Sequence, residues 1–199
     1  MKTNNLPKLM VDSTESDAPA EIMMDYVISW SLRRADVVCK DEKPILYRYC
    51  RAMLAMLLDV ELDATTTFES VETSKQYDGI DLWVELTLNR NGQRERHAIL
   101  IEDKYYSKLR DTRDDDGEYR NQLEVYRKRF DGYYDEQPEQ YHRHYALITC
   151  VDREDPKFAM YDIAPQLGYK TFSLGELLDE NCNHELSESD IFNEFWILW

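Results

Sequence analysis

The segment YDGIDLWVELTLNRNGQRERHAILIEDK, residues 77–104, decides the fold of this 199-residue chain. Apolar and polar side chains alternate from Ile80 to Leu88, with the period of two that marks a strand with two unlike faces. Asn91 and Gly92 form the pair most favoured in a two-residue type I′ turn, because both central positions need a positive φ. Residues 78–104 therefore predict one long antiparallel hairpin.

The register of this hairpin gathers charges at its open end. If residue 90 pairs with residue 93, Asp81 lies directly opposite Glu102, and Lys104 projects from the same face. Two opposed carboxylates destabilise a sheet unless a cation compensates them, and Lys104 supplies only one positive charge. An oxygen-preferring ion such as Mg²⁺ would supply the rest. The alternative is that these three residues lie at a frayed, solvent-exposed end of the hairpin, where water screens their charges.

Composition limits the class of protein. With 43% hydrophobic residues, 6 Gly and 6 Pro, the chain is neither disordered nor collagenous. No apolar run approaches the roughly 18 residues of a membrane span, and the polar N-terminus has no signal core. We therefore expect a soluble, cytoplasmic protein. The four cysteines lie far apart without a C-x-x-C pair, which favours reduced structural thiols over a zinc site: Cys39, Cys50, Cys150 and Cys182.

The length favours a single domain over residues 17–199, preceded by a flexible N-terminal arm over residues 1–16. Asp17 is a candidate N-cap for a helix over 18–35. Residues 43–59 carry the clearest apolar helical stripe, and 67–74 resemble a first strand.

Three further elements are expected after the hairpin. A polar loop over 107–117 leads to a helix over 118–130, whose apolar stripe contains Tyr119 and Leu123. A strand is expected over 144–152. The segment 168–180 predicts another strand and then a helix, opened by the capping box Ser173 to Glu176.

The net charge of −16 is distributed unevenly. Residues 90–144 hold 12 basic and 13 acidic side chains, whereas both flanking regions are acidic. The acidic regions before and after residues 90–144 would repel a polyanion such as nucleic acid, whereas the nearly neutral region 90–144 would not. The basic residues after the hairpin could contact phosphates or could be solvated surface charges: Lys108, Arg110, Arg113, Arg120, Arg127, Lys128 and Arg129.

These residues resemble the PD-(D/E)xK nuclease superfamily, and especially its RecB-type branch. That family carries an Asp on the second core strand, (D/E)-x-K on the third and often Q-x-x-x-Y on the next helix. The corresponding residues here are Asp81, Glu102, Lys104, Gln122 and Tyr126. Gly79-Ile80 replaces the family's proline before the first acidic residue. The resemblance covers about residues 43–175. It implies a three-layer α/β/α sandwich with a central mixed β-sheet and a restriction-endonuclease-like core in the order αβββαβ.

The resemblance also implies a function, namely hydrolysis of phosphodiester bonds in nucleic acid with Mg²⁺ or Mn²⁺. DNA is the expected substrate, in DNA processing or in defence against foreign DNA. Metal ligands would be Asp81 and Glu102, helped by the carbonyl of Asp103, whose side chain should point to the opposite face. Lys104 would position or deprotonate the attacking water, and Gln122 would orient the substrate or a water. The expected substrate contacts are Tyr126, Arg120 and Lys108, and the candidates for an additional acidic ligand are Glu21, Glu61 and Glu72.

A second class of function stays open. The acidic flanks equally suit a catalytically silent nuclease-fold module that binds or assembles with a protein, or an acidic mimic of DNA. The apolar end IFNEFWILW, residues 191–199, could dock a partner or a second copy of the chain. It could also cover the chain's own sheet.

Overall fold

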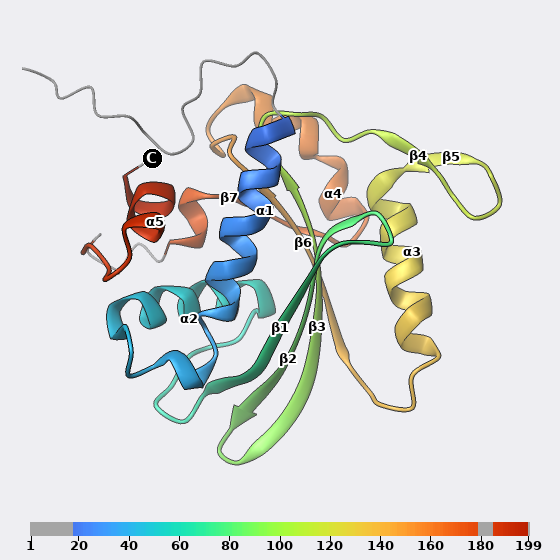
Figure 1. Cartoon of the computed structure of the whole chain (residues 1–199). Helices are drawn as coiled ribbons and strands as arrows, with labels where there is room; N and C mark the ends of the chain where they lie inside the picture. The colour runs from blue at the N-terminus through green and yellow to red at the C-terminus, as the bar shows by residue number, and fades with distance from the viewer. Residues whose placement is uncertain (1–17, 179–184, 199) are drawn as a thin grey trace, which may run out of the picture.

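The computed structural model describes residues 18–178 and 185–198 (Figure 1). The N-terminal arm over 1–16, the N-cap candidate Asp17, Cys182 and Trp199 lie outside the described residues. In the described part, Cys39, Cys50 and Cys150 are free thiols. No helix in these two ranges is both long enough and apolar enough to span a bilayer.

A five-stranded mixed sheet forms the centre of the molecule, in the order β1-β2-β3-β6-β7. The first three strands are antiparallel, whereas β6 runs parallel to β3 and β7 runs parallel to β6. The strands span Thr67–Tyr77 (β1), Ile80–Arg90 (β2), Gln93–Lys104 (β3), His142–Thr149 (β6) and Lys170–Ser173 (β7).

The β2–β3 hairpin has the predicted register. Arg90 pairs with Gln93, and the ladder continues without a bulge to Leu82 and Ile101. Asn91 and Gly92 have φ values of 53° and 79°, as a type I′ turn requires. Continuation of the same register by one residue leads to Asp81 and Glu102.

Helices cover both faces of the sheet and enclose a hydrophobic core on each side (Figure 1). One face carries α1 (Ala18–Arg33), α2 (Pro44–Leu58) and the C-terminal α5 (Asp190–Phe192), which continues as a π-helix (η4, Asn193–Ile197). The other face carries α3 (Gln122–Asp135), η2 (Pro156–Tyr161) and α4 (Ile163–Gln166). The fold is therefore a mixed α/β arrangement of helix, sheet and helix layers. Two short 3₁₀ turns complete it: η1 (Val37–Cys39) and η3 (Gly175–Leu177).

Helix α2 follows directly from its sequence. Pro44 occupies the first turn, where its missing N–H is not needed, and Asp59 ends the helix in the left-handed conformation with φ of 60°. The methionine Met53 is 1% exposed and fills the core on this face, as its place on the apolar stripe predicts.

The region after the hairpin differs from the sequence prediction. The expected helix over 118–130 begins only at Gln122, and the segment before it forms two short antiparallel strands, β4 (Asp111–Arg113) and β5 (Tyr119–Asn121). Asn121 caps α3 by accepting a hydrogen bond from the Leu123 N–H at 3.0 Å. Tyr119 is 67% exposed instead of lying on the apolar stripe. The turn forms because the Asp114 carboxylate accepts backbone N–H bonds within it.

The C-terminal region also departs from expectation. Glu176 accepts a hydrogen bond from the Ser173 N–H at 2.8 Å, but the described residues that follow form only the single turn η3. Phe192, Phe195 and Trp196 are buried in the core beneath α1 and α2. These three rings therefore cover the chain's own domain and do not form an exposed docking surface.

Candidate functional site

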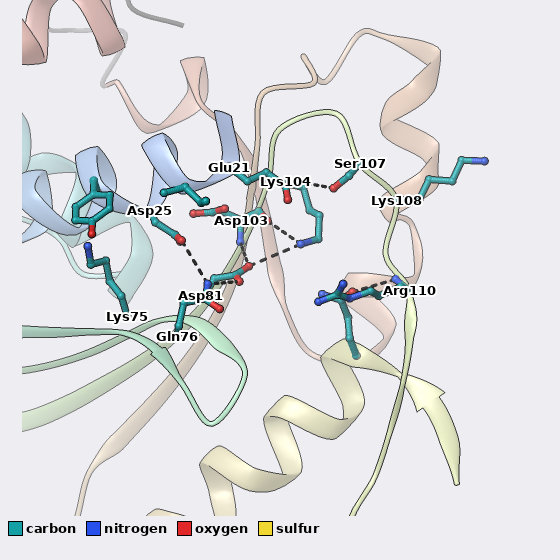
Figure 2. Close-up of a pocket in the computed structure, with 13 residues that line it drawn as sticks. Glu21, Asp25, Lys75, Gln76, Asp81, Asp103, Lys104, Ser107, Lys108 and Arg110 are labelled. Atoms are coloured by element: carbon teal, nitrogen blue, oxygen red, sulfur yellow. Dashed lines mark hydrogen bonds and ion pairs between the residues drawn. The ribbon is translucent and has the colours of Figure 1, made fainter. Parts of the chain in front are cut away.

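The open end of the β2–β3 hairpin lies beside a hollow of about 760 Å³ (Figure 2). Asp81 is contributed by the start of β2, Asp103 and Lys104 by the end of β3, and Gln122 by the first position of α3. The remaining lining residues are Glu21, Ile22, Asp25, Tyr26, Lys75, Gln76, Ser107, Lys108 and Arg110. The sheet, α1 and α3 thus meet at one site.

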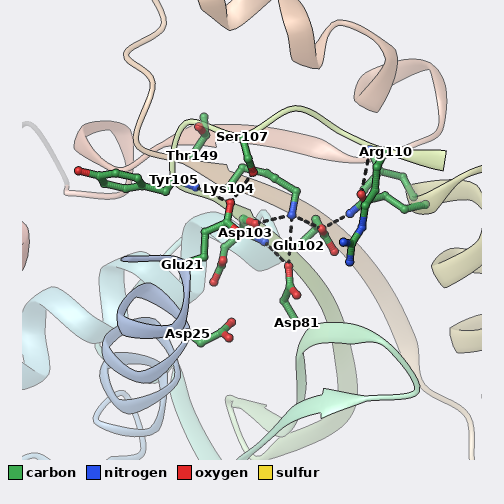
Figure 3. A network of polar contacts seen from close by, with 12 residues as sticks. Glu21, Asp25, Asp81, Glu102, Asp103, Lys104, Tyr105, Ser107, Arg110 and Thr149 are labelled. Carbon is green, nitrogen blue, oxygen red and sulfur yellow. Dashed lines mark hydrogen bonds and ion pairs between the residues drawn. The ribbon is translucent and has the colours of Figure 1, made fainter. Parts of the chain in front are cut away.

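Lys104 is at the centre of this site (Figure 3). Its Nζ lies 2.5 Å from Glu102 Oε1 and 3.7 Å from Asp81 Oδ2. The same Nζ donates a hydrogen bond to the carbonyl oxygen of Asp103 at 2.9 Å. Asp81 Oδ2 also accepts a hydrogen bond from the Asp103 N–H at 3.2 Å. The three side chains grouped by register are therefore in direct electrostatic contact.

Burial makes these charges interact strongly. Glu102 is 1% exposed and Lys104 is 7% exposed. Burial, followed by the charge of Asp81, raises the pKa of Glu102 well above its ordinary value. Burial alone would lower the pKa of Lys104, but the negative charges of Glu102 and Asp81 outweigh it and raise that pKa. Lys104 is therefore a protonated ammonium at neutral pH.

Gln122 holds Glu102 in position. Its Nε2 donates a hydrogen bond to Glu102 Oε1, and its Oε1 accepts one from the Arg110 N–H at 3.0 Å. The Gln122 N–H in turn donates to the Arg110 carbonyl at 3.0 Å. The Gln122 side chain is 0% exposed.

Asp103 faces the opposite side of the sheet from Glu102, as alternation predicts, yet this side also belongs to the site because α1 crosses it. Asp103 is 1% exposed and Asp25 of α1 is 6% exposed. Burial, followed by the charge of Asp25, raises the pKa of Asp103, and burial raises the pKa of Asp25 to about 6. Sequence reasoning did not identify Asp25, although it lies four residues after Glu21 and thus on the same helix face.

The three candidates for an additional acidic residue have separate locations. Glu21 lines the hollow and accepts hydrogen bonds from the Tyr105 N–H at 3.3 Å and from the Ser107 hydroxyl. Glu61 lines a different hollow beyond α2, and Glu72 lies opposite Glu85 on β2. Of the three, only Glu21 lies at this site.

A further residue that the sequence did not indicate is Gln76, near the end of β1. Its Nε2 donates hydrogen bonds to Asp81 Oδ1 at 3.0 Å and to Asp25 Oδ2 at 3.4 Å. Gln76 has a φ of 52°, which no sequence pattern predicts for this residue type. It links the carboxylates from the sheet and from α1.

The three residues expected to contact a substrate do not lie together in the hollow. Lys108 lines the outer edge of the hollow, and Figure 2 shows its side chain pointing away from the carboxylates. Arg120 does not line the hollow and forms an ion pair with Asp114 at 2.8 Å. Tyr126 is only 5% exposed and packs beside Gly79 in the turn before β2. Direct contact with a bound ligand is therefore available to Lys108 but not to Tyr126 in this arrangement.

The donor set fits an oxygen-preferring cation only in part. Asp81 and Glu102 share one face, and the buried Oε2 of Glu102 accepts no hydrogen bond from any described residue. The described ranges contain no group of three or more His, Cys, Asp or Glu residues arranged to hold a metal ion. Two carboxylates nevertheless suffice for Mg²⁺, which usually keeps several waters. The Asp103 carbonyl is a weaker candidate because it accepts the Lys104 bond.

Comparison of the chain with protein-family models, with curated proteins and with solved structures found no match.

Proposed function

We propose that the chain is a Mg²⁺- or Mn²⁺-dependent nuclease that hydrolyses phosphodiester bonds, with DNA as the expected substrate. The observation that carries this proposal is the contact of Lys104 with both Glu102 and Asp81 at the edge of a hollow. Two carboxylates on neighbouring strand ends can hold a metal ion, and an ammonium beside them can stabilise the negative charge that develops on a phosphodiester during hydrolysis.

Asp81 and Glu102 would hold the metal ion, which when bound would neutralise charge on the phosphate and acidify a bound water. Without a bound cation, the negative charges of Glu102 and Asp81 raise the pKa of Lys104, so that its ammonium would donate a hydrogen bond to a water or to a phosphate oxygen. A metal ion held by the same two carboxylates would lower that pKa. Gln122 is a positioning residue, since both ends of its amide are bonded to Glu102 and to the Arg110 backbone. Lys75, Lys108 and Arg110 add positive charge along the hollow.

The test is a cleavage assay with Mn²⁺ and then Mg²⁺ on single-stranded, double-stranded and branched DNA, with RNA as a further substrate. The native chain is compared with Glu102→Gln and Lys104→Ala, and Glu118→Gln serves as a matched control because Glu118 lies in the exposed β4–β5 turn. We expect the first two variants to lose at least 100-fold in rate, in line with removal of a group that stabilises transition-state charge. The control should match the native chain.

The second candidate function is a silent binding or assembly module, and the net charge of −16 favours it. A measurement independent of turnover distinguishes the two. Titration of Mn²⁺ by isothermal calorimetry should show a site that disappears in Asp81→Asn. Absence of both Mn²⁺ binding and cleavage in the folded native chain would remove the nuclease proposal and leave the binding module.

A further inference from the structure

A second hollow lies on the α3 side of the sheet, between the end of β1, β2 and the C-terminal half of α3. Its volume is about 210 Å³, and it is lined by Glu72, Ser74, Tyr77, Trp83, Glu85 and Tyr133. None of these residues lines the hollow beside Lys104. With a volume below the range of about 300–1,000 Å³ typical of drug-sized ligands, it suits a single small group.

Three aromatic rings form this hollow. The Trp83 ring meets the Tyr77 ring at 89° with centroids 5.2 Å apart, and the Tyr133 ring at 86° with centroids 5.1 Å apart. Trp83 is 6% exposed, whereas Tyr77 and Tyr133 are 51% and 41% exposed. Trp83 is therefore a fixed floor and the two tyrosines are walls that stand perpendicular to it. We refer to these three rings as the aromatic cage.

The Trp83 ring is fixed by hydrogen bonds behind it. Its indole Nε1–H donates to the Tyr134 hydroxyl at 2.7 Å, and this hydroxyl donates to the Glu85 carboxylate. Because its single donor is already used, the indole offers a ligand only its π surface. The face of an aromatic ring carries partial negative charge and attracts a cation.

Two carboxylates that form no ion pair with a described lysine or arginine line the aromatic cage. Glu72 and Glu85 are directly opposite each other on β1 and β2, an arrangement that destabilises a sheet. Across residues 18–178 and 185–198, no ion pair joins either carboxylate to a lysine or arginine. The cation–ring contacts in these ranges involve rings other than those of the cage. The described part of the chain thus supplies no cation of its own to this site.

We propose that the aromatic cage binds a methylated ammonium group. A guanidinium is flat and stacks on a single ring face, whereas a methylated ammonium is round and contacts perpendicular rings at once. It also has few or no N–H donors that would need strong acceptors, while Glu72 and Glu85 supply the opposite charge. The group could belong to a methylated lysine of a protein or to a small quaternary ammonium compound, and both present the same chemistry to the cage.

The experiment is an NMR titration of the full chain labelled with ¹⁵N, in which the indole N–H signal of Trp83 is identified by its loss in Trp83→Phe. The probes are choline, N-acetyl-trimethyl-lysine amide, N-acetyl-arginine amide and 3,3-dimethylbutanol, the neutral analogue of choline. We expect both methylated cations to shift the Trp83 signal at millimolar or lower concentration. The alcohol and the arginine derivative should bind at least fivefold more weakly.

Variants assign the binding to the cage. Tyr133→Ala should weaken the methylated cations by roughly twofold to thirtyfold, the range expected for one cation–ring contact. Glu72→Gln keeps every ring and should also weaken them, whereas Tyr119→Ala, which removes an exposed tyrosine outside the cage, should not. If the trimethyl-lysine derivative binds more tightly than choline, the natural ligand is a methylated lysine of a protein. If it binds equally or more weakly, the natural ligand is a small quaternary ammonium compound. Equal binding of the neutral alcohol, preference for arginine, or unchanged affinity in folded Tyr133→Ala and Glu72→Gln would each overturn the proposal.

Discussion

Replacement of Lys104 by methionine tests the electrostatics of the site without any assumption about its function. The change keeps an unbranched side chain of similar length and removes the one ammonium that contacts Glu102 within residues 18–178 and 185–198. Glu102 is 1% exposed, so its charge cannot be screened by water. Removal of one partner from a buried ion pair costs about 3–5 kcal/mol because the other charge is left uncompensated. For a chain of this size, that loss corresponds to a fall in Tm of about 6–20 °C.

The loss should depend on pH in a defined direction. The pKa of Glu102 is already raised in the folded protein and rises further when the Lys104 charge is removed. A carboxyl group whose folded pKa exceeds its unfolded pKa binds protons more strongly when folded, so stability falls as pH rises between the two values. The difference between native and Lys104→Met should therefore be small near pH 4 and should grow toward pH 7.

The assay is guanidinium unfolding followed by circular dichroism at pH 4, 5.5 and 7. The double variant Glu102→Gln/Lys104→Met is the control, because it removes both charges and should recover most of the stability lost in the single variant. A cost below about 1 kcal/mol at pH 7 would match a solvent-screened surface pair and would refute the buried-charge reasoning. A cost that does not change with pH would refute the role of Glu102.

Three other features give independent predictions for unfolding experiments. Burial raises the pKa of Asp25 to about 6, so stability should fall as pH rises from about 4 to 6, and Asp25→Asn should flatten this dependence in urea unfolding across pH 4–8. Gly92→Ala should cost about 1–3 kcal/mol by chemical unfolding, the strain of a positive φ, and Gly168→Ala should cost more, because the added Cβ also displaces the Arg127 guanidinium from its hydrogen bond to the Leu167 carbonyl. Tyr134→Phe should cost about 1–3 kcal/mol in the same measurement, because it leaves the buried Trp83 indole N–H without an acceptor.

The hairpin and the core of the site were predictable because their determinants are local. The turn at Asn91 and Gly92 fixes one pair, and the alternation of β2, which Trp83 interrupts, favours the same register for the others. The same register then places Asp81 near Glu102 and Lys104, so the grouping of the three side chains follows from one turn. No knowledge of the distant chain is required for this step.

The remaining parts of the site depend on long-range packing that periodicity does not reveal. Asp25 reaches Gln76 only because α1 crosses the end of the sheet. The start of α3 was misplaced because Tyr119 has helical spacing from Leu123, while β4 and β5 have three residues each and are too short to show a period of two. Gln122 is buried because its amide bridges Glu102 and the backbone of Arg110, the residue directly before β4.

The distribution of buried charge is difficult to explain by stability alone. Glu102, Asp103 and Asp25 are each less than a tenth exposed, and burial raises the pKa of all three. Carboxylates are almost never buried unless they are paired, and Lys104 contacts only one of these three within ion-pair distance. Apolar side chains at the same positions would favour the folded state more. Clustering of perturbed carboxyl groups at a hollow is instead typical of sites that bind or transform a ligand. Asp25 and Asp103 connect α1 to β3, and Gln122 connects β3 to α3. The residues that pay for burial of the carboxyl groups therefore also connect the two helix layers to the sheet.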